Sequence, residues 1–483
     1  MASRPTSATR HNPDEDNMYQ SQRLAIKYLV VAFALFGVMI VAGLLTAAYY
    51  IQPGLLFNTL NFSTAKILHI DTLVVWNLMG FFGAVYWFLP QEVEREVVGI
   101  RLANVTFWVF CAAFLAVAAV FAVVQTGPTS ESTLWLINQG RKYVEAPRWA
   151  ALGILAIVAV FMFNIIATAV KARRMSGVLG VLIVDLVPLF VLYLDAFPSE
   201  TNMAKDMYWW WWLVHLWVEA TWEVLIACIM AWTLMRLLNT PRRIVETWLY
   251  ITIGLVMGSG ILGLGHHYYW IGTPKYWFDL GGFFSALEPL PLIGMVVHAV
   301  YDAGVHRMHC SNRPALYWMF AEAFGNFFGA GVFGFMMTLP QINLFTHGTQ
   351  WTASHGHFAW WGAYVCGLIS IFYVVLAQAR DAKQVDGSLW KWSFALLNLG
   401  IVGMVGGLLV AGMAQTFYER ALGGSTLQSF IEAQGSSWFV EGMWVRMVFG
   451  VMFAIGYVLL IIDLARVGRT ASAARLHIAE VGA

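Results

Sequence analysis

The chain has 483 residues, 59% of them hydrophobic and 11% charged, and its mean hydropathy is +0.66. Soluble domains carry roughly 25% charged residues, so this composition excludes a soluble globular protein and indicates an integral membrane protein. The net charge of +1 gives no electrostatic reason to expect a nucleic-acid partner. The four cysteines form no CxxC pair and no CxxCH haem-attachment motif, so neither a disulfide framework nor a covalent haem is predicted.

Apolar runs long enough to cross a bilayer recur along the whole chain. They predict an all-α polytopic membrane protein with about twelve transmembrane helices in a single domain at 25–466, between tails at 1–24 and 467–483. The first tail lacks the apolar core of a signal peptide. The runs lie at residues 25–50, 67–90, 100–125, 148–171, 178–196, 208–237, 244–271, 278–303, 314–338, 352–379, 390–417 and 441–466.

Basic residues between the runs predict how the chain crosses the membrane, because cytoplasmic loops are enriched in Lys and Arg. Alternate loops and both tails are rich in these residues, whereas the loops on the opposite side hold few. Both termini are therefore predicted to be cytoplasmic. The cationic residues of the opposite, outer loops are Lys66, Arg141, Lys142, Arg148, Lys205, Lys275 and Arg420.

Histidines at membrane depth begin with His69, near the outer start of the second run. The tenth run enters from the same side and carries His355 and His357. Residues two apart in an α-helix point about 200° apart, so these two side chains leave the helix on nearly opposite sides and can serve two different cofactors. His69 and one of the pair can hold one haem from both faces, an arrangement that suits electron transfer rather than ligand binding.

A second histidine group lies in the sixth and seventh runs. His215, Glu219 and Glu223 follow one another at i, i+4 and i+8, which places them on one helix face. His266 and His267 lie between glycines in the seventh run, where another group can approach the backbone closely. Three imidazoles from two helices predict one non-haem metal site, and iron, copper and zinc all suit it.

Carboxylates at membrane depth are unfavourable unless they are paired, protonated or functional. Glu219 lies one turn from His215 and is predicted to ligate the metal or to donate protons beside it. Glu223 lies one turn further along, and Glu288 falls within the eighth run. Both are predicted to act as proton-relay or supporting groups.

This order of histidines resembles the haem-copper oxidase superfamily. Four longer stretches are similar to the large catalytic subunits of the cytochrome c-dependent nitric oxide reductase family, and the resemblance covers nearly the whole chain. The stretches are Trp-Trp-Trp-Leu-Val-His215-Leu-Trp-Val-Glu219, Gly265-His266-His267-Tyr-Tyr-Trp-Ile-Gly-Thr-Pro, Phe284-Ser-Ala-Leu-Glu288-Pro-Leu and Thr346-His-Gly-Thr-Gln-Trp-Thr-Ala-Ser-His355-Gly-His357.

The resemblance implies a role for each histidine. His69 and His357 would be the axial ligands of a low-spin haem b, and His355 the proximal ligand of a high-spin haem b3. The implied reaction converts two NO, two protons and two electrons into N2O and water. Electrons would pass from haem b to the second haem and a non-haem iron, which together hold two NO molecules close enough for N–N bond formation.

The same resemblance assigns His215, His266 and His267 to the non-haem iron, with Glu219 beside it. Glu223 and Glu288 match glutamates that the family keeps near this iron. Family members take protons from the outer side of the membrane. The outer residues Glu145 and Asp206 are candidates for that path.

The resemblance also implies partners and a location. Because the chain has no CxxCH motif, it would form a heterodimer with a membrane-anchored cytochrome c subunit in the bacterial inner membrane, and a soluble donor would supply the electrons. The quinol-using form of the enzyme carries a long N-terminal extension. The first apolar run begins near residue 25, which indicates the form that uses cytochrome c.

Lys142 departs from the family pattern. In Gln139-Gly-Arg-Lys142-Tyr-Val-Glu145-Ala-Pro147, the family usually has Glu at the position of Lys142. That Glu helps to hold a calcium ion that bridges the haem propionates. A lysine ammonium group has no lone pair with which to ligate calcium, so Lys142 is predicted to neutralise the propionates itself and calcium is not expected.

Two other functions fit parts of the pattern. An oxygen-reducing cytochrome c oxidase would use the same scaffold with copper at the three-histidine site. Many such oxidases have a tyrosine where Glu219 stands, and one family keeps its tyrosine on the following helix, where Tyr268 and Tyr269 lie. A non-catalytic transporter or haem carrier would have unpaired histidines and no second metal, which the complete set of histidines argues against.

Overall fold

The computed structural model describes residues 18–469, except residues 57, 126–128, 305–309, 386, 423 and 425. Most of the two predicted tails therefore lies outside the described residues. The described residues form helices joined by loops and contain no β-strand, only two isolated β-bridges. An apolar chain in lipid must satisfy its backbone groups internally, and helices do so within each segment.

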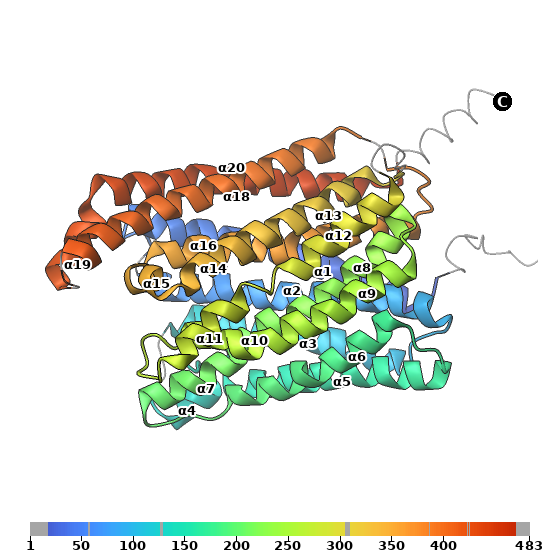
Figure 1. The fold of residues 1–483 in the computed structure, drawn as a ribbon, viewed down its shortest axis with the longest axis horizontal. Coiled ribbons are helices and arrows are strands. Elements are labelled where there is room, and N and C mark those ends of the chain that lie inside the picture. The colour runs from blue at the N-terminus through green and yellow to red at the C-terminus, as the bar shows by residue number, and fades with distance from the viewer. Residues whose placement is uncertain are drawn as a thin grey trace, which may run out of the picture.

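Within the described residues, twelve spans are long and apolar enough to cross a membrane, which confirms the predicted number. They run roughly along one direction in Figure 1 and form one bundle. The spans are Gln20–Ile51 (α1), Phe62–Val93 (α2), Ile100–Val124 (α3), Arg148–Ala172 (α5), Gly177–Ala196 (α6), Met203–Leu238 (α7 and α8), Arg242–His267 (α9 and α10), Tyr276–Ala303 (α11 and α12), Arg313–Thr338 (α13 and α14), Gln350–Ala379 (α16 and α17), Leu389–Leu422 (α18) and Ser437–Arg466 (α20).

Several spans are interrupted by π-helical turns, which the sequence pattern does not predict. A π-helical turn inserts one extra residue and rotates the following side chains relative to the preceding ones. Among the described residues these turns are η2 (Leu216–Trp222), η3 (Ile253–Met257), η5 (Asn326–Val332), η6 (Trp361–Val365) and η7 (Gln415–Leu422).

The segments that the turns separate, with the two 3-10 turns, are α6 (Gly177–Val191), η1 (Leu192–Ala196), α7 (Met203–His215), α8 (Glu223–Leu238), α9 (Arg242–Thr252), α10 (Gly258–Gly263), η4 (Leu264–His267), α11 (Tyr276–Ser285), α12 (Leu290–Ala303), α13 (Arg313–Gly325), α14 (Phe333–Thr338), α16 (Gln350–Trp360), α17 (Cys366–Ala379) and α18 (Leu389–Ala414).

Three short helices, α4 (Glu131–Leu136), α15 (Pro340–Thr346) and α19 (Leu427–Gly435), lie between spans at one end of the bundle, on the left in Figure 1. This end, which we name the α4 end, corresponds to the predicted outer side. Three spans form the centre: the most apolar windows of 62–93, 203–238 and 350–379 are 83% buried, against 17–44% for the others. These central spans carry His69, His215, His355 and His357.

Close backbone contact between α13 and η6 places the tenth span against its neighbour. Gly325 and Gly362 face each other, and a Cβ added to Gly325 would lie 2.6 Å from the Gly362 Cα. A Cβ at Gly362 would overlap the Gly325 carbonyl group. Only glycine permits this separation, which sets the position of the span that carries His355 and His357.

We expect Gly362→Val to destabilise the bundle by about 1–3 kcal/mol, because backbone atoms on both sides leave the new side chain no room. Thermal unfolding of the detergent-solubilised protein measures this change. Gly406→Ala in α18 is the control, because a Cβ there meets no atom within 4 Å. An equal midpoint of unfolding for both variants would contradict the interpretation.

Candidate haem and metal sites

His69 on α2 and His357 on α16 face each other inside the bundle. Their ring centroids are 6.1 Å apart and their planes differ by 24°. Two imidazoles that ligate one metal from opposite sides, at about 2 Å each, have centroids about 6 Å apart. The observed spacing therefore fits a bis-histidine haem, as the sequence predicts.

The other ring nitrogen of each histidine contacts a backbone carbonyl. His69 Nδ1 lies 2.9 Å from the Met39 oxygen, and His357 Nδ1 lies 2.7 Å from the Ala353 oxygen. A carbonyl can only accept, so each Nδ1 must donate, and the Nε2 lone pair is left for a metal. Gly43 leaves room for this arrangement, because a Cβ there would lie 2.8 Å from the His69 ring.

His355 points to a different part of the bundle. Its Nδ1 donates to the Gly329 oxygen in η5 at 3.0 Å, and its ring packs against Phe333 and Gly334. No second histidine faces it as His69 faces His357 among the described residues. The opposite directions of His355 and His357 agree with the two-residue spacing.

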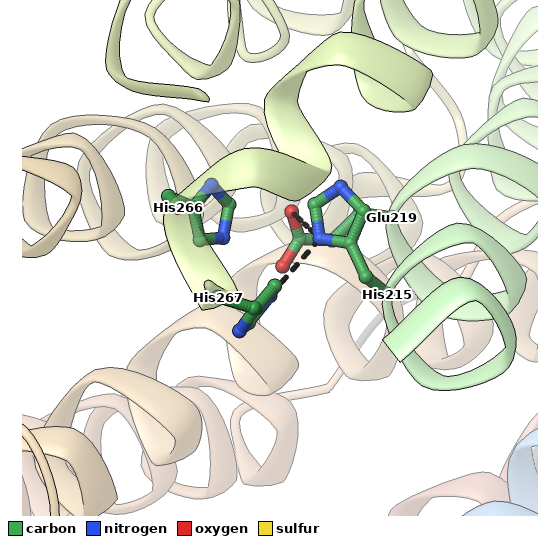
Figure 2. Close-up of side chains that lie close together, drawn as sticks. All are labelled: His215, Glu219, His266 and His267. Atoms are coloured by element: carbon green, nitrogen blue, oxygen red, sulfur yellow. Dashed lines mark hydrogen bonds and ion pairs between the residues drawn. The ribbon is translucent and has the colours of Figure 1, made fainter. Parts of the chain in front are cut away.

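Three histidines and one carboxylate converge at the second site, as Figure 2 shows. His215 ends α7, Glu219 lies in η2, and His266 and His267 lie in η4. One ligand atom from each residue lies within 4.8 Å of the others. The set predicted from the sequence is therefore brought together in space.

Hydrogen bonds decide which ring nitrogens face the centre. His215 Nε2 lies 3.0 Å from the Gly260 oxygen and must donate to it, so Nδ1 carries the lone pair. That Nδ1 lies 3.1 Å from both His267 Nε2 and Glu219 Oε2. Electron-rich atoms that converge in this way repel one another unless a cation or a proton lies between them, so the residues fit a bound metal ion.

Neighbouring side chains support this cluster. The Ser285 hydroxyl lies 2.8 Å from His266 Nδ1 and directs Nε2 of that ring toward the centre. Trp211 stacks on His267 with ring centroids 3.8 Å apart. A hydrogen bond to the ring nitrogen that does not bind the metal orients a ligating histidine and makes its other nitrogen a stronger ligand.

A cavity of about 770 Å³ joins the two sites, within the range of roughly 300–1,000 Å³ typical of ligand pockets. Its wall includes the bis-histidine pair, His355, the metal cluster, and Glu219, Glu223 and Glu288. His355 therefore shares a cavity with the cluster rather than being separated from it.

Known proteins are similar to this chain over almost its full length. Residues 23–452 match the family described as Cytochrome C and Quinol oxidase polypeptide I. The chain is 34% identical over 457 residues to a nitric oxide reductase subunit from Stutzerimonas stutzeri, covering 93% of this chain and 96% of that one. The chain belongs to the cytochrome c and quinol oxidase polypeptide I family.

More distant members of the family include the cytochrome c oxidase subunit 1 homolog of Bradyrhizobium diazoefficiens bacteroids. It is 23% identical over 455 residues, which cover 87% of this chain and 78% of that one. The fold is similar to that of a heme-copper terminal oxidase dimer determined by cryo-electron microscopy, with a TM-score of 0.68 at 13% identity over 93% of this chain and 84% of that one. The chain is thus a multi-pass bacterial membrane oxidoreductase of the haem-copper oxidase superfamily.

Glu223 and Glu288 line the cavity of this family member without an ion pair. Glu223 Oε2 and Glu288 Oε1 are buried and have no hydrogen-bond partner among the described residues. Glu288 also contacts Gly263, because a Cβ there would lie 2.6 Å from its carboxyl oxygen. The π-helical turn η2 between His215 and Glu223 separates the predicted helix face into two parts, and only Glu219 reaches the cluster.

The three residues predicted near the outer surface are placed differently from one another. Lys142 lines the cavity, whereas Asp206 forms an ion pair with Arg141. Glu145 is buried beside Asp71, and burial and the Asp71 carboxyl raise its pKa well above the usual value, which favours a neutral carboxyl group. The geometry does not join Glu145 and Asp206 by a direct contact.

Sequence reasoning missed several residues of these sites. Ser285, Trp211 and Arg446 were not predicted to contribute, although all three line the cavity. Arg446 had a usable signal, because an arginine inside an apolar run requires a reason. Ser285 had none, since nothing in a sequence shows which hydroxyl will meet a given imidazole.

We expect Ser285→Ala to weaken metal binding at the cluster by roughly 10–100-fold, as loss of such supporting hydrogen bonds does in other metal sites. Competition with a graded series of chelators, followed by elemental analysis, measures the affinity. Ser393→Ala, which removes a buried hydroxyl that donates to the Trp390 carbonyl in α18 and lies outside the cavity lining, is the matched control. Equal affinities in the two variants would contradict the role of Ser285.

Proposed function

We propose that this chain is the catalytic subunit of a nitric oxide reductase, which reduces two NO to N2O and water. The observation that carries the proposal is the carboxylate of Glu219, 3.1 Å from His215 within the three-histidine cluster. Many oxygen reductases have a tyrosine at this position. A carboxylate added to imidazoles also suits non-haem iron better than Cu(I), which prefers softer ligands.

Each histidine has a definite part in this proposal. His69 and His357 would hold haem b from both faces, which leaves it no open position and limits it to electron transfer. His355 would hold haem b3 from one face only. His215, His266 and His267, with Glu219, would hold non-haem iron across the cavity, and the two irons would supply binding sites for two NO molecules.

The protein supplies proximity and groups that can carry protons. Glu219 has 33% of its side chain exposed to the cavity, where it can hold a proton beside the cluster. Glu223 and Glu288 line the same cavity and are candidates to pass protons to it. Tyr364 donates to the Val218 carbonyl at 3.0 Å and thereby holds the turn that carries Glu219.

The chain would work as part of a larger assembly in the bacterial inner membrane. We propose a heterodimer with a membrane-anchored cytochrome c subunit, which a soluble donor reduces. Both termini would be cytoplasmic, with the transmembrane domain at 25–466 between the tails at 1–24 and 467–483. Glu145 and Asp206, at the α4 end, remain the candidates for an outer proton path.

The alternative function is oxygen reduction with copper at the cluster. It is favoured by the similarity to a cytochrome c oxidase subunit 1 homolog. However, the hydroxyl groups of Tyr268 and Tyr269 donate to the carbonyls of Tyr208 and Thr338, and neither tyrosine lines the cavity. This position gives neither residue direct access to the cluster.

Elemental analysis combined with turnover measurements tests the proposal. We expect iron to exceed the haem content by one atom per chain, copper to be absent, and NO turnover to exceed O2 turnover on the same sample. Copper at the cluster together with dominant O2 turnover would replace nitric oxide reduction by the alternative.

We expect Glu219→Gln to lower NO turnover by roughly 10²–10⁴-fold, the usual contribution of a positioned acid–base group. Haem content should be unchanged, because Glu219 contacts neither His69, His355 nor His357. Glu432→Gln removes an exposed carboxylate on α19 and serves as the control. Full activity of Glu219→Gln would remove this residue from the mechanism.

A further inference from the structure

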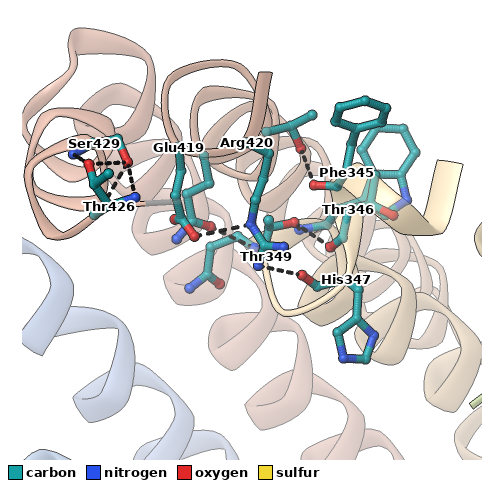
Figure 3. A network of polar contacts seen from close by, with 12 residues as sticks. Phe345, Thr346, His347, Thr349, Glu419, Arg420, Thr426 and Ser429 are labelled. Atoms are coloured by element: carbon teal, nitrogen blue, oxygen red, sulfur yellow. Dashed lines mark hydrogen bonds and ion pairs between the residues drawn. The ribbon is translucent and has the colours of Figure 1, made fainter. Parts of the chain in front are cut away.

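Among the residues that the structure describes, eight cationic side chains lie toward the α4 end of the bundle, and five of them are ion-paired. The pairs are Arg141 with Asp206, Arg148 with Glu131, Lys205 with Glu200, Lys275 with Asp279, and Arg420 with Glu419. Figure 3 shows the last pair, in which Arg420 also donates to the His347 carbonyl.

The other three cations, Lys66, Lys142 and Arg446, have no carboxylate oxygen within 4.0 Å among the described residues. These three are also the only cationic side chains among the described residues that line the cavity. The unpaired charges and the cavity therefore coincide, which indicates that the missing anion belongs inside the cavity.

Arg446 makes the strongest case. It lies nine residues into α20, and the residue is only 7% exposed. Its guanidinium contacts the Met443 sulfur at 4.0 Å and the face of Tyr50, with the carbon 5.6 Å from the ring centroid. Neither contact neutralises a charge. A buried, unpaired guanidinium is strongly unfavourable, so an anion is required beside it.

The position of Arg446 identifies which anion it can meet. Arg446, His69 and His357 line the same cavity, so the guanidinium lies on the side of the bis-histidine pair. Any haem held by that pair carries two propionate carboxylates on its edge. A guanidinium binds carboxylates through two parallel hydrogen bonds, which makes arginine well suited to this contact.

Lys66 and Lys142 form the second part of the set. Lys66 lies three residues before His69, about one helical turn toward the α4 end. Lys142 comes from the loop before α5 and lies close enough to Lys66 for their charges to repel. Glu145 lies nearby, but neither of its carboxyl oxygens is within 4.0 Å of the Lys66 or Lys142 amine.

We propose that Lys66, Lys142 and Arg446 form a cationic clamp that binds the haem propionates directly and takes the place of a bridging divalent cation. The clamp rests on the proposed function, since it requires haem in the cavity. It extends the expectation for Lys142 to two further residues, one of them on the last span. Cations beside a haem stabilise its reduced form, so the clamp also raises the reduction potential.

Calcium content is the first test, made on the complete complex after dialysis against a calcium chelator. We expect no calcium by elemental analysis, with both haems and the midpoint of thermal unfolding unchanged. One tightly held calcium per chain would overturn the clamp. A complex that contains no haem b would instead overturn the proposed function, so the two failures are distinguishable.

Potentiometric titration of the low-spin haem is the second test. We expect Lys142→Met and Arg446→Met to lower its midpoint potential and the charge-retaining Lys142→Arg and Arg446→Lys to preserve most of it. Lys205→Met, which removes an ion-paired cation outside the cavity, should leave the potential unchanged. If the Arg446→Met complex does not assemble, the potentials of the Arg446→Lys and Lys142→Met complexes test the clamp. Unchanged potentials in the Met variants that retain haem would overturn the clamp.

Discussion

Hydrogen bonds from imidazole nitrogens to backbone carbonyls are the interaction on which the sites depend. His69, His215, His355 and His357 each have one ring nitrogen within 2.7–3.0 Å of such an oxygen. Because a carbonyl can only accept, each ring has a single possible tautomer and one lone pair. All four lone pairs are thereby available in one cavity before any metal binds.

The π-helical turns contribute to these arrangements. A π-helical turn changes the register of a helix and leaves backbone groups available. The acceptor of His355 is Gly329, inside η5, and Glu219 lies inside η2. After η6, the Gly367 N–H donates to the buried Glu322 carboxylate at 2.6 Å. The turns thus carry the Gly329 acceptor and Glu219, while the other three acceptors lie in regular helices.

Much of the architecture could be predicted from the sequence, because a membrane span is defined by length and apolar composition. The predicted spans differ from the structure by at most five residues, as at 25 against Gln20. The histidines and Glu219 were identifiable because polar groups are rare at membrane depth. Their grouping into two sites followed from helix periodicity and from the resemblance to a family.

Other features depend on three-dimensional contacts that no local pattern contains. The π-helical turns have no composition that distinguishes them from the surrounding apolar helix. Ser285 meets His266 only because α11 packs beside η4. The pairing of the cations at the α4 end, which leaves Lys66, Lys142 and Arg446 unpaired, combines local pairs such as Lys275 with Asp279 and a pair between distant segments, Arg141 with Asp206. The clamp therefore depends on the three-dimensional partners of all these cations.

Spectroscopy of ligand binding tests most directly whether His355 and His357 serve two different haems. In the reduced complex, carbon monoxide should shift the optical bands of one haem and leave those of the other unchanged. His357→Ala should remove the low-spin signal and retain carbon monoxide binding, and His355→Ala should do the reverse. Loss of both signals in either variant, in protein that remains folded, would contradict the assignment of the two histidines to opposite sides of one helix.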